Sequence, residues 1–351
     1  MSRFLIVDFR DKEIWDSLIC EDADIYYKWQ YVDAFRVIGD GEPFLAYYES
    51  GNSKLYNVFL KRDISNHEFY KARINDSLYY DITTPYGYGG IVLNGEENIV
   101  KEYQLLFDEY CIKNNIICEF VRLNPLSNNF KYYMDTHYEC IKLSTTVYIQ
   151  LESEIKIWDD FKSSCRNKIR KAQNNDIEIK SGFDSKFMDE FKEIYYRTMD
   201  RDKGTNYYYF ENGFFDSILK NLNKNGRIYT AYYNEKPISS ILILFSGKNA
   251  HYHLGGSLND YMKLGANNIL LYSAACDLVN MGYSKLHLGG GYGGGDSTLL
   301  RYKKSFNPNG IADFYICKRV YDLDVYNHLI DLRKSDDKFD LNSSYFPLYR
   351  Q

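Results

Sequence analysis

The chain has 351 residues, which is enough for two hydrophobic cores of ordinary size. Its formal net charge of −5 argues against a protein that binds nucleic acid over its whole surface, although a local basic patch stays open. Hydrophobic residues make up 45% and charged residues 26% of the chain, which is typical of a soluble globular protein.

Cysteines and apolar runs indicate the compartment. The seven cysteines are scattered and form no C-x-x-C pair, which predicts reduced thiols in a cytoplasmic protein rather than a disulfide framework or a zinc site. The N-terminal sequence MSRFLIVDFRDKEIW has early acidic residues and is not typical of a signal peptide. No run approaches the roughly 18 apolar residues of a membrane span, which leaves only peripheral membrane contact open.

The first half of the sequence alternates short strand-like runs with a helical one. Strands are predicted at 43–49, 53–61, 79–83, 117–123 and 147–151. Apolar residues recur at helical spacing over 97–114, which predicts an amphipathic helix. The glycines of TPYGYGGIV, residues 84–92, indicate a loop where the backbone turns tightly or approaches a ligand.

The second half repeats this plan. Helices are predicted at 157–174, 186–199, 214–223 and 269–281, and strands at 227–233, 239–245 and 285–288. The repetition predicts an α+β fold of two duplicated domains, at 1–150 and 151–320, each with a mainly antiparallel sheet flanked by helices. Residues 321–351 are rich in aromatic side chains, so we expect them to pack against the first domain.

Four residues near the helix at 269–281 suit the binding of a donor group. Gly255 and Gly256 end a predicted strand, and Asn267 and Asn268 open the helix. Backbone approaches a ligand closely at glycines, and the exposed N–H groups of a helix start bind phosphate. This arrangement indicates group transfer.

His251 and His253 alternate on a predicted strand and therefore share a face. The sequence offers no third ligand beside them, so we predict a core or pocket-lining role and no metal site, with acid/base duty as the alternative.

Several segments together resemble the FemAB/FemX-like branch of the GNAT acyltransferase superfamily, whose members contain tandem GNAT domains. In the family's order, the matching segments are DIYYKWQYVDAF with GEPFLAYYE, TPYGYGGIV, SSCRNKIRKAQNNDIEI, YHLGGS, LGANNILLY and LGGGYGGGDSTLLRYKKSF. The long helical hairpin of some relatives is absent, as in the compact FemX-like form. The resemblance implies two tandem GNAT-like domains and transfer of an acyl or aminoacyl group to an amine.

The resemblance also implies substrates. In the best-known relatives the donor is aminoacyl-tRNA and the acceptor is a peptidoglycan precursor, so we expect a nucleotide-linked or cell-wall precursor here, tRNA as a partner, and no DNA. The superfamily's acyl-CoA signature, Arg/Gln-x-x-Gly-x-Gly/Ala, reads MKLGAN at 262–267. The co-substrate therefore stays open between aminoacyl-tRNA and acyl-CoA, and no tightly bound cofactor is predicted.

Two alternative functions stay open at this point. One is an acyl-CoA-dependent N-acetyltransferase acting on an amino-sugar nucleotide or a polysaccharide precursor. The other is a non-catalytic protein of the same fold that binds a nucleotide-sugar.

The glycine tract ends in the candidate catalytic residues. Lys303 occupies the lysine position of the family's aromatic–lysine pair, and the resemblance implies that this lysine lies near the acyl centre. Attack of an amine on an ester creates an oxyanion, which a fixed ammonium group stabilises in a dry site. Asp296 is the candidate proton acceptor or a helix cap. Arg301 and Ser297 are close enough in sequence to bind substrate at the same site.

A basic segment and a tyrosine loop supply further candidates for substrate binding. Arg166 and Arg170 are four residues apart on one helical face, which suits the phosphates of a nucleotide-linked acceptor or a tRNA. A solvated helix face is the structural alternative. Tyr86 and Tyr88 either stack on a base or sugar or belong to a purely structural turn.

Overall fold

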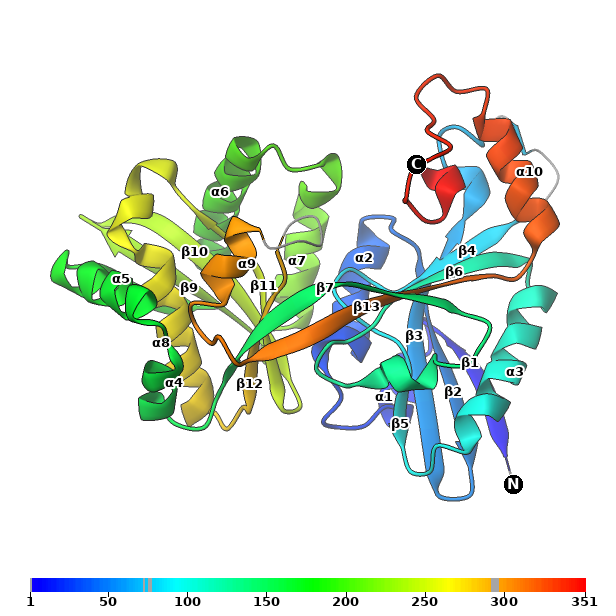
Figure 1. Ribbon diagram of the computed structural model, residues 1–351, viewed down its shortest axis with the longest axis horizontal. Helices are drawn as coiled ribbons and strands as arrows, with labels where there is room; N and C mark the ends of the chain where they lie inside the picture. Colours follow the sequence, from blue (N-terminus) through cyan, green and yellow to red (C-terminus); the bar gives the residue numbers. More distant parts are fainter. Residues whose placement is uncertain (1, 72, 75–77, 292–296) are drawn as a thin grey trace. The chain divides into compact units, whose positions relative to one another are not determined.

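The computed structural model describes residues 2–71, 73–74, 78–291 and 297–351 (Figure 1). The chain forms two compact units. Unit 1 comprises residues 1–19, 39–143 and 314–351, and unit 2 comprises residues 20–38 and 144–313. The predicted domains were 1–150 and 151–320, whereas residues 20–38 and 144–150 belong to unit 2 and residues 314–320 to unit 1. In the segment 20–38 the Phe35 ring lies 5.5 Å from the Phe214 ring.

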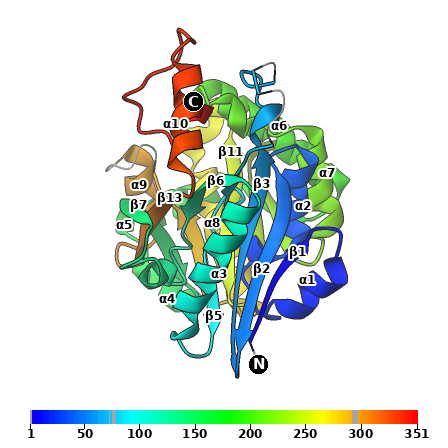
Figure 2. The same cartoon turned by 90° about the vertical axis from the view of Figure 1, so that its right-hand side faces the viewer.

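Unit 1 contains a sheet flanked by helices. Its strands, in spatial order, are β1 (Arg3–Asp8), β2 (Glu42–Ser50), β3 (Ser53–Asp63), β4 (Tyr80–Thr83), β6 (Ile116–Arg122) and β13 (Ile311–Val320), and β5 (Val92–Asn94) pairs with β3. Its helices are α1 (Lys12–Leu18), α3 (Ile99–Lys113), α10 (Leu323–Arg333) and the short η2 (Ile64–Asn66), η3 (Asn129–Tyr132) and η6 (Leu348–Arg350). α3 lies against this sheet, and Tyr103 and Phe107 bury its apolar face (Figure 2).

The C-terminal residues of the chain pack in unit 1. Tyr349 is fully buried, and its hydroxyl group donates a hydrogen bond of 2.9 Å to Asp81 Oδ2. Arg350 and Arg62 also bond to this carboxylate, so the chain end closes around a buried, paired charge.

Unit 2 has the same kind of sheet. Its strands, in spatial order, are β7 (Glu139–Gln150), β12 (Lys285–Gly289), β11 (Asn249–Ser257), β10 (Lys236–Ser246), β9 (Gly226–Tyr233) and β8 (Glu178–Gly182). Its helices are α2 (Trp29–Val37), α4 (Glu154–Asp160), α5 (Ser163–Asn174), α6 (Ser185–Asp202), α7 (Asn212–Asn221), α8 (Ala266–Asn280), α9 (Thr298–Lys303) and the short η1 (Ile25–Tyr27), η4 (Asn206–Tyr208) and η5 (Asn259–Leu264).

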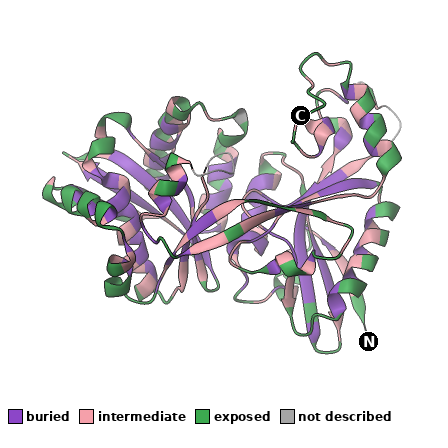
Figure 3. Cartoon of the chain, in the orientation of Figure 1, coloured by how far each residue is buried: buried purple, intermediate pink, exposed green. Residues whose placement is uncertain are grey.

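The sheet of unit 2 is buried between two layers of helices, and its central strands are buried over most of their length (Figure 3). Ile241 and Ile243 share a core with α4, α5 and α8. The alternate residues Leu242 and Leu244 are also fully buried, on the opposite face, where α6 packs against β10 and β11. A strand buried on both faces is expected to be almost continuously apolar, as β10 is.

The two units repeat one order of elements. Unit 1 contributes β1–α1, then β2, β3, β4, α3 and β6, and unit 2 contributes β8–α6–α7, then β9, β10, β11, α8 and β12. In each unit a helix links two parallel neighbours, β4 with β6 and β11 with β12, while the other pairs described are antiparallel. The predicted α+β fold with an internal duplication is confirmed.

One predicted helix is interrupted. The sequence predicted a continuous helix over 157–174, but α4 ends at Asp160 and α5 begins at Ser163. Phe161 and Lys162 have extended backbone between them, and the Phe161 side chain is buried in the core of unit 2. Helical periodicity continues across the break, so the sequence pattern did not show it.

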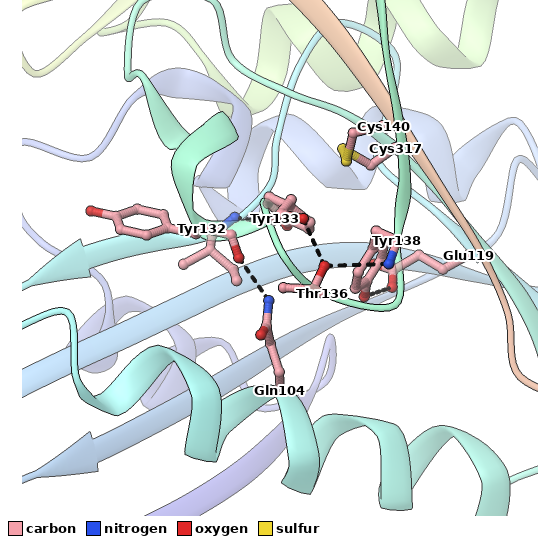
Figure 4. The surroundings of a disulfide bond; sticks show 9 residues. Gln104, Glu119, Tyr132, Tyr133, Thr136, Tyr138, Cys140 and Cys317 are labelled. Atoms are coloured by element: carbon pink, nitrogen blue, oxygen red, sulfur yellow. Dashed lines mark hydrogen bonds between the residues drawn. A yellow bond between two sulfur atoms is a disulfide. The ribbon is translucent and has the colours of Figure 1, made fainter.

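The prediction of reduced thiols is wrong for two cysteines. Cys140 and Cys317 form a disulfide (Figure 4), although 177 residues separate them in sequence. Both cysteines belong to unit 1, where the first residues of β7 approach β13 and the two Cα atoms lie 4.1 Å apart, a tertiary proximity that cysteine spacing does not reveal. Cys20, Cys111, Cys118, Cys165 and Cys276 are free. None of the helices described has the length and apolar character needed to cross a membrane.

Candidate active site

The parallel strands β11 and β12 form a fork in unit 2. They pair only from Asn249 to His251 on β11, opposite Lys285 to His287 on β12. The pairing of β11 with β10 shifts register so that His253 is an extra residue, which is the pattern of a β-bulge. A bulge bends its strand, so β11 leaves β12 at this point. Open α/β sheets bind ligands beyond the carboxyl ends of such strands.

Lys303 brings a buried cation to this fork. The residue is only 9% exposed, and its Nζ donates a hydrogen bond of 2.7 Å to the carbonyl oxygen of Gly290, just after β12. The same Nζ lies 5.9 Å from the ring centre of Tyr252 on β11. Burial lowers the pKa of Lys303 to about 8. The ammonium form therefore still predominates at pH 7, by roughly ten to one.

Ser297 has a structural role at the start of α9. Its Oγ accepts a hydrogen bond of 3.2 Å from the Leu300 N–H, as expected of an N-cap. The cap fixes the helix that carries Lys303. The sequence predicted a substrate contact for Ser297 and a possible cap for Asp296, and in the structure Ser297 is the cap. Asp296 lies outside the described residues.

Three buried histidines lie beside the fork. His251 Nε2 is 3.0 Å from an Asp24 carboxylate oxygen, and the His251 ring is 5.6 Å from the His287 ring. His253 packs against Tyr31. Burial lowers the pKa of His253 to about 3 and holds the pKa of His287 far below its usual value. These are properties of an apolar interior, and no cluster of three metal-ligating side chains occurs in the part of the chain described.

The predicted donor glycines have different roles. A Cβ on Gly256 would lie 2.6 Å from Thr198 Oγ1 and 2.9 Å from the Ile194 carbonyl oxygen. Gly256 therefore lets β11 approach α6. A Cβ on Gly255 would lie 2.4 Å from the hydroxyl of Tyr252, the ring beside Lys303, so Gly255 is the one of the two that adjoins the fork.

The start of α8 is covered by α5. Gly265 has a positive φ of 79°, and a Cβ there would lie 2.5 Å from the Lys168 carbonyl oxygen. Asn268 is buried and donates to Cys165 Sγ at 3.4 Å. Asn267 donates to the Tyr302 hydroxyl at 2.9 Å. The two asparagine side chains thus contact α9 and α5, so both are already bonded within the domain.

Arg166 and Arg170 share a helical face, as predicted, and that face contacts α4. Arg166 donates to the carbonyl oxygens of Trp158 and Asp159 at 3.2 and 3.4 Å. The Arg170 guanidinium lies 5.2 Å from the Trp158 ring. Arg166 therefore binds the C-terminal carbonyls of α4, which is a structural role that the sequence did not indicate.

Tyr86 and Tyr88 belong to unit 1. The Tyr88 ring meets the Phe314 ring edge-on at 5.2 Å, and burial raises the pKa of Tyr88. A Cβ on the neighbouring Gly90 would lie 2.8 Å from the Asn129 side chain, and the φ of Gly90 is 89°. The glycines of this loop therefore have a structural cause.

A cavity of about 270 Å³ lies between α5 and α9 in unit 2. It is lined by Ser164, Cys165, Lys168, Thr298, Arg301, Tyr302 and Ser305. Only Arg301 was among the predicted substrate-binding residues. The sequence analysis singled out the segments that contain the other lining residues, but not the residues themselves. Which side chains of α5 and α9 face each other depends on tertiary packing, which sequence patterns do not show.

Comparisons with known proteins bear on the family and the fold of the chain. Residues 159–304 match the family described as acetyltransferase (GNAT) domain. The fold is similar to the crystal structure of FemX, with a TM-score of 0.66 and 10% identity over 93% of this chain and 99% of that one. No curated protein matches the sequence significantly.

Two other solved structures are similar. One is the C-terminal domain of a putative lysylphosphatidylglycerol synthetase from Agrobacterium fabrum, with a TM-score of 0.58 and 15% identity over 92% of this chain and 95% of that one. The other is a tandem GNAT protein from the clavulanic acid biosynthesis pathway, with a TM-score of 0.50 and 7% identity over 92% and 99%. The chain thus has the tandem GNAT fold, residues 159–304 form a GNAT domain, and the protein is an acyltransferase.

Proposed function

We propose that the protein transfers an aminoacyl group from aminoacyl-tRNA to an amine of a cell-wall or cell-surface precursor. The observation that carries this proposal is the buried ammonium group of Lys303 at the fork of β11 and β12. A cation fixed in a site with little water stabilises the oxyanion of an acyl transfer much better than a solvated one does.

The reaction proceeds by direct attack. The amine nitrogen bonds to the ester carbonyl carbon, the negative charge on the oxygen faces Lys303, and the ester C–O bond then breaks. The proton lost by the nitrogen ends on the departing hydroxyl oxygen, carried by Asp296 or by a phosphate of the donor. Cys165 is buried and its pKa is raised by that burial, which does not suit a covalent nucleophile.

Three observations favour a tRNA donor over acyl-CoA. The sequence at 262–267 departs from the acyl-CoA signature, and the first turn of α8 that follows is covered by α5. In addition, one similar structure is described as a putative lysylphosphatidylglycerol synthetase, a name that specifies a product with an aminoacyl group.

The second candidate is an acyl-CoA-dependent N-acetyltransferase acting on an amino-sugar nucleotide or a polysaccharide precursor. The description of the matching family as an acetyltransferase domain favours it.

Donor identity is the test. The full chain is incubated with UDP-linked muropeptides or amino-sugar nucleotides as acceptors, together with either tRNA charged with radiolabelled amino acids or radiolabelled acetyl-CoA. We expect label to reach a muropeptide from charged tRNA and not from acetyl-CoA. Prior treatment of the tRNA with ribonuclease should abolish this transfer. Transfer from acetyl-CoA that ribonuclease leaves unchanged would replace the proposal with the second candidate. Binding of nucleotide-sugar without turnover from either donor would indicate a non-catalytic protein.

A further inference from the structure

The cavity between α5 and α9 has the features of an anion site. Ser164, Cys165 and Lys168 of α5 form one wall, and Thr298, Arg301 and Tyr302 of α9 form the other, with Ser305 beside them. Its volume of about 270 Å³ is below the range of pockets that enclose drug-sized ligands. The cavity therefore fits a small group rather than a whole cofactor.

The charges that line the cavity are both positive. Lys168 and Arg301 contribute them, and no carboxylate is among the lining residues. Neither cation forms an ion pair with any residue in the described ranges, whereas other arginines of the chain, such as Arg62 and Arg319, are paired. Both side chains are exposed, so their charges are accessible to an anion that enters the cavity.

The start of α5 lies at the same cavity, because Ser164 and Cys165 are among the lining residues. The helix has 12 residues, and its N-cap residue Lys162 makes no side-chain capping bond. The first backbone bonds of this turn run from the N–H groups of Cys165 and Arg166 to the Lys162 carbonyl oxygen. The N–H groups of Ser163 and Ser164 precede them, where an α-helix leaves donors open and its dipole favours an anion.

The cavity also adjoins the proposed acyl site. Tyr302 lines it, and the next residue, Lys303, places its Nζ at the fork. The Tyr302 hydroxyl accepts a hydrogen bond from Asn267, which leaves the hydroxyl proton free to be donated. Two successive residues of α9 therefore serve the two places, since Tyr302 lines the cavity and Lys303 lies at the fork. A ligand that occupied both places would contact both residues.

We propose that this cavity binds a phosphate group of the acyl donor's leaving group. The proposal rests on the proposed function for the nature of the donor. Phosphate chemistry is shared by two sources, a phosphodiester near the 3′ end of an RNA and a phosphate of coenzyme A. In either case the cavity replaces the covered first turn of α8 as the site that holds the donor's phosphate.

The test is equilibrium binding by the full-length chain. The probes are a deacylated RNA minihelix that ends in 3′-CCA, coenzyme A, and dephospho-coenzyme A, each measured at several salt concentrations. Lys168→Gln and Arg301→Gln remove one charge each from the cavity. Lys171→Gln is the matched control, because it removes one charge from the same helix outside the cavity.

For a phosphate of RNA, Lys168→Gln and Arg301→Gln each weaken minihelix binding about tenfold. Each also lowers the slope of log affinity against log salt by about 0.7, the contribution of one single-stranded phosphate contact. Lys171→Gln changes the affinity much less. For coenzyme A, both variants instead weaken coenzyme A binding and leave minihelix binding at the control level.

If all three variants bind each of the three probes alike, the cavity proposal is overturned, and the proposed function is unaffected if the wild-type chain still transfers label from charged tRNA. Conversely, the cavity variants could bind the probes more weakly while the wild-type chain shows no transfer activity. That result would support the cavity as a phosphate site and overturn the proposed function. Circular dichroism spectra of the variants confirm that each is folded.

Discussion

The two units contain the same pair of parallel strands linked by a helix, but the pairs end differently. In unit 1 the contacts continue past the end of β4, where the Thr84 N–H donates to the Phe120 carbonyl oxygen at 3.1 Å. The Arg122 guanidinium then donates to the Thr84 and Pro85 carbonyl oxygens at 2.7 and 3.0 Å. In unit 2 the pairing stops at His251, and Lys303 lies at the gap. The same pair of parallel strands is therefore closed by hydrogen bonds at its end in unit 1 and separates at its end in unit 2.

Buried charges show the same contrast. Asp81 of unit 1 is fully buried and is bonded to Arg62, Arg350 and Tyr349. Burial alone would raise its pKa, yet the two arginines hold the pKa of Asp81 below its usual value. Lys303 of unit 2 is also buried, but its only hydrogen bond described is to a neutral carbonyl oxygen. We infer that the first charge serves stability and the second serves chemistry.

Asp81→Asn should have the largest effect on stability. The substitution leaves Arg62 and Arg350 buried without a full counter-charge, which typically costs about 3–5 kcal/mol. Urea unfolding at neutral pH measures it, and the signal should include release of the C-terminal residues that pack around Tyr349. A loss below about 1 kcal/mol would contradict a stabilising role for this cluster.

Lys303→Met should have the opposite profile. Turnover is expected to fall about 100- to 1000-fold, as for loss of one oxyanion-stabilising group. Unfolding free energy should stay constant or rise by about 1 kcal/mol, because an unpaired buried cation is replaced by an apolar chain of similar length. Arg122→Met is the matched control in unit 1, and it should destabilise the protein without changing the chemical step. Unchanged turnover in Lys303→Met would show that Lys303 does not stabilise the oxyanion.

The pH dependence separates activity from stability at Lys303. The pKa of Lys303 is lowered to about 8 from about 10.5, so between these values the unfolded chain binds more protons than the folded one. Unfolding free energy should therefore rise with pH across this window, by at most about 3 kcal/mol. Turnover should fall over the same window as the ammonium form is lost. Lys303→Met, measured in parallel, should lack the rise in stability.

Much of the fold could be predicted from local patterns, because strands such as β10 carry their apolar residues in the sequence itself. Lys303 could be predicted because it follows a family motif. By contrast, the role of Lys168 depends on where α5 packs against α8 and α9, and the disulfide of Cys140 depends on the partner strand. Periodicity describes one element at a time, so contacts between distant elements escaped it. The break at Phe161 escaped for the same reason, because it is set by core packing.

Glu119 gives the smallest expected effect and the sharpest counterpart to Lys303. It is a buried carboxyl group of unit 1 that accepts a hydrogen bond from the Tyr138 hydroxyl (Figure 4) and another from the Tyr321 hydroxyl. Burial raises the pKa of Glu119 to about 7, so the folded chain binds more protons than the unfolded one between about pH 4.5 and 7. The contribution of Glu119 to stability is therefore present at low pH and is lost as pH rises through this window.

Glu119→Gln keeps an oxygen acceptor for both tyrosines and removes the titration. At pH 8 the variant should be more stable by about 1 kcal/mol, because the gain from removing a buried charge is partly offset by the new amide N–H donors. Turnover should be unchanged, in contrast to Lys303→Met. Urea unfolding of wild type and variant at pH 5 and pH 8 checks this. A stability difference that is the same at both pH values would show that folding does not raise the pKa of Glu119, and that the two buried groups do not mirror each other.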